Sequence, residues 1–263
     1  MAERARQVPA FTADVFAARS TRYCVVVPVI NEGDRIRRQL GRMEPRAGEA
    51  DIVMADGGST DGSLDPAFLR SKGVRALLTK TGPGRLGAQL RMGFSWALDE
   101  GYEGVVTVDG NDKDGVEAIP AFVRALDEGV GFAQGSRFVA GGRHANTPAV
   151  RLAAVRLIHA PFVSILARHR YTDTTNGFRA HSRALLEDPR AGVFRDVFDG
   201  YELLVHLSQT APRLGYRVVE IPVSRVYPKG AKAPTKLTRI GGSAELLGVL
   251  LRAARGDFRV PDQ

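Results

Sequence analysis

Residues 51–63 read DIVMADGGSTDGS, an apolar run that stops in a dense cluster of turn-forming residues. The run 51–55 predicts a buried strand, and the cluster predicts a loop at its carboxyl end. Upstream, residues 23–36 read YCVVVPVINEGDRI and repeat the arrangement, with Pro28 and Asn31 near the end of the apolar run. Two such units in succession predict parallel strands of one buried sheet.

The alternation of strands and helices continues along the chain. Further strands are expected at residues 104–108, which lead into DGNDKD, and at residues 217–221. Helices are expected at residues 36–43, 86–98, 150–170 and 201–209. This order predicts a doubly wound, mostly parallel α/β sheet, in which ligands bind beyond the carboxyl ends of the strands.

Composition agrees with one globular domain. The chain has 263 residues, of which 44% are hydrophobic and 25% charged, and both fractions are ordinary for a folded protein. The formal net charge of +8 favours anionic partners such as nucleoside diphosphates, lipid phosphates or an acidic membrane face. We expect no nucleic acid as a partner, because the positive net charge is the only feature of the sequence that would support one.

The chain also carries hints about its compartment. Cys24 is the single cysteine, so it forms no intrachain disulfide, and a reducing compartment fits. The N-terminal residues contain no apolar run of the secretory type. Apolar stretches such as 246–251 fall short of the roughly 20 residues of a spanning helix. We therefore expect a cytoplasmic protein whose membrane contact, where there is one, is peripheral and at the inner face.

Three polar loops each follow a predicted strand. They contain Asn31 with Glu32, Asp56, and Asp109. Because parallel strands end at the same edge of a sheet, the three loops should meet there. Any one of them is commonly just a turn, but their convergence indicates a site.

Seven motifs in order along the chain resemble glycosyltransferase family 2, which has the GT-A fold. The closest resemblance is to the branch of dolichyl-phosphate mannose synthases and bacterial polyprenyl-phosphate sugar transferases. The motifs, which span roughly residues 23 to 236, are VVVPVINEGDRI, DIVMADGGSTDGS, GRLGAQLRMGFSWAL, VVTVDGNDKDG, GSRF, TDTTNGFRA and VVEIPV. The resemblance implies a single Rossmann-like GT-A domain with a mostly parallel central sheet flanked by helices. It would occupy residues 23–226, after an N-terminal extension at 1–22 and before a basic C-terminal loop and helix at 227–263.

The resemblance also implies a binding site for a nucleotide-sugar donor with UDP or GDP as the nucleotide. Its implied members are Pro28, Asn31 and Glu32 around the nucleoside, Asp56 on the base or ribose, and Gly84 with Arg85 near the base or diphosphate. Many relatives carry a second acid where this chain has Gly57, which leaves the identity of the base open. Arg137 and Arg179 are implied phosphate contacts, and a guanidinium suits that role because of its planar fork of donors.

The family's metal-binding Asp-x-Asp corresponds here to Asp109, Gly110 and Asn111. The resemblance implies Mg²⁺ or Mn²⁺ bridging the donor phosphates, with Asp109 and Asn111 as ligands. An amide oxygen can bind a hard cation but brings no charge. Whether Asp112 or Asp114 completes the site is left open.

The reaction implied is an inverting transfer of a hexosyl or N-acetylhexosaminyl group. Asp173, in the acceptor-side motif, could orient or deprotonate a hydroxyl, and Glu202 and Asp199 lie where other members carry a base. We favour a polyprenyl phosphate as acceptor over a hydroxyl of a soluble saccharide or natural-product intermediate. A non-catalytic nucleotide-sugar-binding subunit is the less favoured alternative, and a homodimer stays open.

Two further segments carry hypotheses. Arginines flank the apolar helix expected at 150–170, and we favour its packing against the sheet over docking on lipid. The basic segment from Tyr227 to Lys236 suggests a loop that closes over the bound diphosphate.

The histidines lack metal-ligand spacing, and we interpret His144, His159, His181 and His206 as ordinary surface or core residues.

Overall fold

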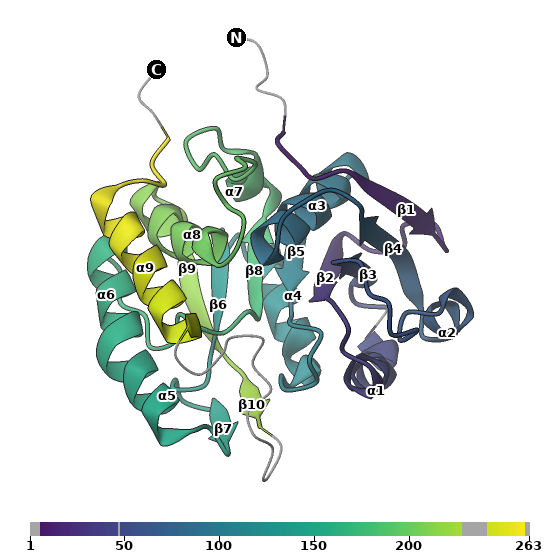
Figure 1. Ribbon diagram of the computed structural model, residues 1–263, viewed down its shortest axis with the longest axis horizontal. Coiled ribbons are helices and arrows are strands. Elements are labelled where there is room, and N and C mark those ends of the chain that lie inside the picture. The colour runs from purple at the N-terminus through teal and green to yellow at the C-terminus, as the bar shows by residue number, and fades with distance from the viewer. Residues whose placement is uncertain (1–5, 47, 228–240, 261–263) are drawn as a thin grey trace.

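The computed structural model describes residues 6–46, 48–227 and 241–260. An eight-stranded sheet runs through the centre of the molecule (Figure 1). Its strands, in their order across the sheet, are β1 (Phe11–Val15), β4 (Val74–Lys80), β3 (Asp51–Asp56), β2 (Tyr23–Val29), β5 (Gly104–Thr107), β8 (Arg179–Ser182), β6 (Phe132–Ser136) and β9 (Val218–Pro222).

The sheet is parallel over the half that contains three of the four predicted strands, β2, β3 and β5, together with β4, which was not predicted. Strands β4, β3, β2 and β5 are parallel neighbours, and β6 pairs with β9 in the same sense. Strand β8 is antiparallel to both β5 and β6. The edge strand β1 is antiparallel to β4, so the segment expected as an extension outside the domain adds a strand to its sheet.

Helices cover both faces of the sheet (Figure 1). Successive side chains of β2 alternate between two apolar layers, with Cys24 and Val26 in one and Val25 and Val27 in the other. Cys24 is fully buried, as expected for a packed thiol. The first layer contains α3 (Leu86–Asp99), α7 (Arg183–Glu187), α8 (Glu202–Arg213) and α9 (Gly241–Arg255), and the second contains α1 (Asp34–Met43), α2 (Pro66–Ser71) and α4 (Ile119–Asp127).

The start of α3 lies against the loop that precedes α8. A Cβ on Gly87 would lie 2.3 Å from the carbonyl oxygen of Phe198, so this approach needs glycine. The backbone N–H groups of Gly87 and Ala88 donate to the carbonyl of Asp199 at 2.8 and 3.3 Å. The contact fixes the loop carrying Arg85 beside residues 198–200.

The helix expected at 150–170 is interrupted. It consists of α5 (Ala149–Ala154), a π-helical turn (Val155–His159) and α6 (Ala160–Ala167). A π turn inserts one extra residue and is frequent at functional sites. Here it leaves His159 buried on the inner side of the helix.

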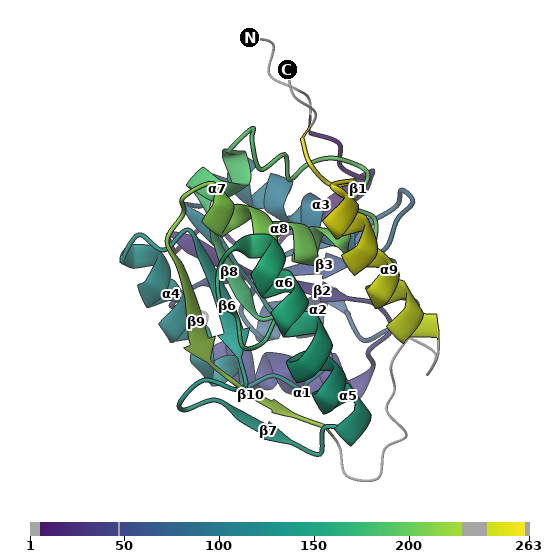
Figure 2. The same cartoon turned by 90° about the vertical axis from the view of Figure 1, so that its left-hand side faces the viewer.

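This 19-residue run bears on the expectation that the apolar stretches are shorter than a spanning helix, because by length and composition only it is long and apolar enough to cross a membrane. The core helix of a soluble protein can meet the same criterion. The sequence pattern concealed the run because Arg151 and Arg156 divide the apolar residues. Packing, which was favoured for this helix, accounts for one side of it, since 22% of an 18-residue stretch within the run is buried. Figure 2 shows α5 and α6 running along the face of the molecule that also presents α9.

A small second sheet pairs β7 (Arg143–Ala145) with β10 (Ser224–Val226). An antiparallel bridge between Asp114 and Arg225 ties β10 to the loop after β5. Tyr227 follows directly. The loop hypothesis for Tyr227 to Lys236 otherwise lies outside the described residues, since these stop at Tyr227 and resume at residue 241.

Candidate active site

A cleft of about 550 Å³ opens beyond the carboxyl ends of β2, β3 and β5. The structure brings half of the proposed site residues to its wall. These are Pro28, Glu32, Gly84, Arg85, Asp109, Gly110 and Asn111. The other half, which lies outside the wall, consists of Asn31, Asp56, Arg137, Asp173, Arg179, Asp199 and Glu202.

Asn31 and Asp56 connect two of the loops. Asn31 has a positive φ of 50°, and its side-chain oxygen accepts from Thr60 N at 2.8 Å. Asp56 accepts from the N–H of Ser59 at 2.9 Å and from its hydroxyl at 2.6 Å, and the N–H of Asn31 donates to the same hydroxyl at 3.0 Å. Both side chains therefore hold the loops that surround the cleft wall at Glu32.

Gln89 packs against Gly57 at the ends of two strands. Its amide nitrogen donates to the carbonyls of Val29 and Ala55, both at 2.9 Å, and so joins the ends of β2 and β3. A Cβ on Gly57 would lie 2.9 Å from that nitrogen. Gln89 and Gly57 therefore lie together in the wall of the cleft.

Asp109 and Asn111 offer oxygen atoms of the kind that Mg²⁺ and Mn²⁺ prefer. The buried Oδ1 of Asn111 has no hydrogen-bond partner among the described residues, which fits a ligand atom awaiting a cation. Within the part of the chain that the structure describes, no group of three or more His, Cys, Asp or Glu side chains could hold a metal ion. Asp109 and Asn111 would therefore supply only part of the ligands that such a cation takes.

Asp112 and Asp114, which were left open as further metal ligands, are both paired with arginines. Asp112 has a positive φ of 58° and pairs with Arg38 and Arg42 of α1 at 3.0 and 2.7 Å. Asp114 is fully buried, and its carboxylate lies 2.5 Å from Arg225. The guanidinium of Arg225 also reaches Asp109 at 3.2 Å, so a cation of the chain itself lies between the two carboxylates.

Basic side chains line several parts of the cleft, and three of them gather at one end, which is called the cationic end here. The side chains of Lys113, Arg151 and Arg225 all line it, and each lies over the ring of Tyr227 at 5.4, 5.8 and 5.9 Å. Burial and the neighbouring Arg225 lower the pKa of Lys113. Three basic groups around one aromatic ring form a subsite suited to a phosphate.

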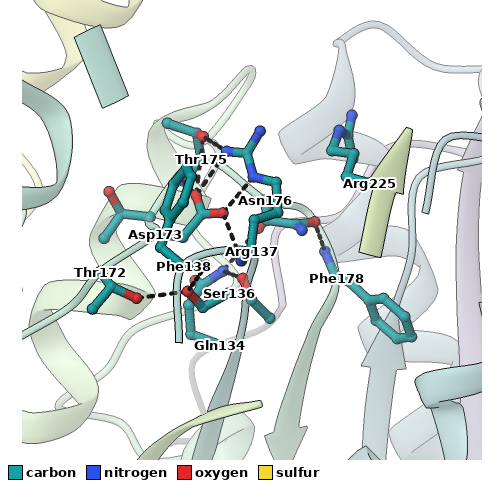
Figure 3. Close-up of polar contacts among 12 residues, drawn as sticks. Gln134, Ser136, Arg137, Phe138, Thr172, Asp173, Thr175, Asn176, Phe178 and Arg225 are labelled. Atoms are coloured by element: carbon teal, nitrogen blue, oxygen red, sulfur yellow. Dashed lines mark hydrogen bonds and ion pairs between the residues drawn. The ribbon is translucent and has the colours of Figure 1, made fainter. Parts of the chain in front are cut away.

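Asp173 is buried in a bidentate pair with Arg137 (Figure 3). The two bonds measure 2.6 and 3.0 Å. Burial raises the pKa of Asp173, but the bonds with Arg137 outweigh burial and the pKa is lowered overall. Glu220 holds the same loop by accepting from the N–H of Thr172 at 2.9 Å. The loop lines the cleft through the buried Thr174, the half-buried Thr175 and Gly177.

Arg179 holds this loop from beneath. Its guanidinium is fully buried and donates to the carbonyls of Thr174, Asn176 and Leu204 at 2.9, 3.0 and 2.6 Å. Burial lowers its pKa to about 10. In this arrangement Arg179 positions the loop and does not face the cleft. Thr174 also bonds through its hydroxyl to the Nδ1 of His159 at 2.7 Å.

Asp199 and Glu202 stabilise the turn before α8. Asp199 accepts from the backbone and side chain of Arg85 at 3.2 and 3.1 Å, and Glu202 accepts from the N–H of Gly200 at 2.5 Å. Arg85 also pairs with Glu245 of α9 at 2.6 Å. Both acids therefore act as supports of the cleft wall.

Several cleft residues were not identified from the sequence. Gln89, Lys113, Arg151, His159, Tyr201 and Arg225 line the cleft. Arg225 follows the predicted strand at 217–221, and a basic residue just after a strand end could have been counted as a signal. His159 carried no such signal, because the π turn decides which way it faces.

A model described as Glycosyl transferase family 2 matches residues 24–200. Polyprenol monophosphomannose synthase of Mycolicibacterium smegmatis is 29% identical over 206 residues, which cover 77% of each chain. Undecaprenyl-phosphate mannosyltransferase of Micrococcus luteus is 30% identical over 210 residues, 78% of this chain and 84% of that protein. Glucosyl-3-phosphoglycerate synthase from Mycobacterium tuberculosis, solved with Mn²⁺, UDP and phosphoglyceric acid, superposes with a TM-score of 0.61 at 20% identity, covering 92% of this chain and 80% of that one.

Proposed function

The chain belongs to glycosyl transferase family 2, and on that basis we propose that it transfers a sugar from a nucleoside diphosphate sugar to a polyprenyl phosphate. The cationic end of the cleft carries the proposal, because Lys113, Arg151 and Arg225 surround Tyr227 beside Asp109. The names of the two mannosyltransferases that it resembles support mannose as the sugar and a lipid phosphate as the acceptor.

The donor would occupy the other end of the cleft. Pro28, Glu32 and Gln89 line that end, and Gly110 donates its N–H to the carbonyl of Pro28 at 3.2 Å. Asp109 and Asn111 would hold Mg²⁺ or Mn²⁺, which when bound neutralises charge on the donor diphosphate. Arg225, already beside Asp109, would stabilise the charge that develops on the departing diphosphate.

The acceptor would approach from the cationic end. A phosphate oxygen attacks the anomeric carbon, and the bond from that carbon to the donor's phosphate oxygen breaks, which releases the nucleoside diphosphate with inverted configuration at the sugar. A phosphate monoester is largely dianionic at neutral pH, because its second pKa is about 6. The attacking atom therefore has no proton to lose.

The placement of the candidate bases supports this acceptor over a hydroxyl. A hydroxyl needs a base within hydrogen-bond reach of its proton. Asp173 is paired with Arg137, and Asp199 is paired with Arg85. Glu202 accepts a hydrogen bond from the N–H of Gly200. None of these three carboxylates lines the cleft.

An acceptor panel tests the proposal. The protein is incubated with UDP- and GDP-sugars and Mn²⁺, together with a short polyprenyl phosphate, the polyprenol of the same length, or a soluble saccharide, and products are identified by mass spectrometry. We expect sugar on the polyprenyl phosphate alone. Transfer only to a hydroxyl would replace the proposal with the hydroxyl class, and nucleotide binding without any transfer would favour a binding subunit.

A further inference from the structure

The run from α5 to α6 carries an apolar face that the rest of the described chain leaves uncovered. Its large members are Val150, Leu157, Ile158 and Ile165, which are 84%, 75%, 54% and 76% exposed. The smaller residues Ala149, Ala153, Ala154 and Pro161 lie exposed between them. Exposed apolar residues scattered singly are ordinary, whereas a continuous apolar face marks a surface that meets something.

The charged residues of the segment that carries this face are all basic. Between Arg137 and Asp173 the sequence contains no Asp or Glu, and it contains Arg143, Arg151, Arg156, Arg168 and Arg170. Arg143, Arg156, Arg168 and Arg170 are exposed. An apolar helix face bordered by arginines is the pattern of a helix that lies in the plane of an anionic membrane surface.

The opposite side of the same helix run belongs to the protein. Val155, Val163 and Ala167 are buried in the core, and Arg151 and His159 line the cleft. A helix crossing the bilayer would remove these side chains from their contacts. The two sides therefore fit a helix that lies on the membrane while its inner side forms part of the catalytic cleft.

The neighbouring helix α9 extends the same surface. It packs against α6, lies beside it in Figure 2, and exposes Leu247 and Leu251 by about half. Its Leu246 lines the cleft.

We propose that the outer face of α5 and α6, with the exposed leucines of α9, docks the protein on an anionic lipid bilayer so that the cationic end of the cleft opens beside the lipid headgroups. The inference rests on the proposed function for the identity of the acceptor, but the docking itself needs no catalysis. Docking would deliver a lipid-borne phosphate to the cleft without drawing its polyprenyl chain through water.

Vesicle co-sedimentation without donor tests the docking. We expect the protein to sediment with vesicles of phosphatidylcholine mixed with phosphatidylglycerol, and far less with phosphatidylcholine alone. Leu157→Glu/Ile158→Glu should weaken binding at least about tenfold, because two apolar contacts become charged. Arg143→Ala/Arg156→Ala should weaken it about fivefold for each arginine. The matched control is Val15→Glu, since Val15 is 51% exposed on the edge strand β1 and should leave binding unchanged.

Two results would overturn the proposal. One is equal vesicle binding by wild type and Leu157→Glu/Ile158→Glu. The other is a concentration-dependent dimer that this double variant abolishes, because the face would then join two copies of the chain. Turnover of a water-soluble short-chain polyprenyl phosphate separates the two proposals. It should be unchanged in the double variant, whereas its absence in wild type that still binds vesicles would refute only the proposed function.

Discussion

The guanidinium of Arg225 lies 3.2 Å from the carboxylate of Asp109, where a metal-bound diphosphate is proposed to sit. Its other nitrogen lies 2.5 Å from the buried Asp114. In the free protein Arg225 therefore neutralises two carboxylates that would otherwise repel each other. A cation that binds to Asp109 must share that carboxylate with Arg225.

Replacing Arg225 should accordingly strengthen metal binding in the absence of nucleotide. Arg225→Ala alone leaves Asp114 buried without a partner, which typically costs about 3–5 kcal/mol, so Arg225→Gln/Asp114→Asn is the variant to use. We expect its Mn²⁺ affinity, measured by titration calorimetry, to rise on the order of tenfold through the lost competition. An unchanged affinity in a folded double variant would show that Arg225 does not compete with the metal.

Substitution of Gly177 is expected to lower activity as much as substitution of the metal ligands would. A Cβ at this position would lie 2.3 Å from Oδ1 of Asp109, so Gly177→Ala must displace that carboxylate. A misplacement of about 1 Å can cost about 10²-fold in rate, and we expect a loss of this size in kcat/KM with little change in the melting temperature. Gly41→Ala is the control, because a Cβ there meets nothing within 4 Å. Full activity in Gly177→Ala would mean that Asp109 is not held where the reaction needs it.

The variant Asp173→Asn distinguishes a structural role of Asp173 from a role as catalytic base. The change leaves Arg137 buried without its counter-charge, so stability should fall by as much as about 3–5 kcal/mol. Because a phosphate acceptor needs no base, kcat at saturating polyprenyl phosphate should fall much less than the about 10² to 10⁴ that a lost base costs. Thermal melting and single-turnover transfer give the two quantities. A loss of about 10³-fold in a variant that melts normally would assign Asp173 to catalysis instead.

Buried histidines should make the fold sensitive to acid. Burial lowers the pKa of His159 and His206 to about 4 and that of His181 to about 3, from 6.5. Below about pH 6.5 the unfolded chain binds protons that the native state does not, so stability is full above this pH and is lost as pH falls towards the folded values. Each histidine adds about 1.4 kcal/mol per pH unit to the slope.

His181 provides the test of this slope. Neither ring nitrogen has a partner among the described residues, and the ring packs between Phe94 and Phe132 with centroids 5.1 and 5.3 Å away. Urea unfolding between about pH 8 and pH 4 should show His181→Leu to be more stable at neutral pH, by about 1–3 kcal/mol for two groups no longer buried unpaired. The free energy of unfolding of His181→Leu should fall less steeply with decreasing pH than that of wild type, by the contribution of one proton. An identical pH dependence in both proteins would contradict the lowered pKa of His181.

The contrast between β2 and β8 shows what the sequence could reveal. The run Val25–Val27 is buried on both faces, so its β-branched pattern predicted a central strand. Strand β8 carries Arg179 and His181, so its polar pattern resembled a loop. Arg179 is buried by bonding to backbone carbonyls, and His181 is buried by packing between two phenylalanine rings. The edge strand β1 is mostly exposed, and a short exposed strand has no apolar pattern to find.

In the site, too, some features follow from the local sequence and others only from tertiary packing. Strand ends placed Asp109, Asn111 and Glu32 at one edge, which local sequence could predict. The pair between Arg225 and Asp109 joins residues 116 positions apart, and the partners of Asp112 are set by where α1 packs. Side-chain pairing of this kind follows from tertiary approach and leaves no local pattern.

The most direct test follows sugar transfer and nucleotide binding in the same preparation of wild type and Asp109→Ala. With Mn²⁺ present, wild type should bind the nucleoside diphosphate of its donor more tightly than without metal and should transfer the sugar to a short polyprenyl phosphate. Asp109→Ala should keep the fold, lose the Mn²⁺-dependent part of binding and lose transfer by at least about 10²-fold. Near-normal, Mn²⁺-dependent transfer by Asp109→Ala would contradict the placement of donor, metal and reaction in this cleft.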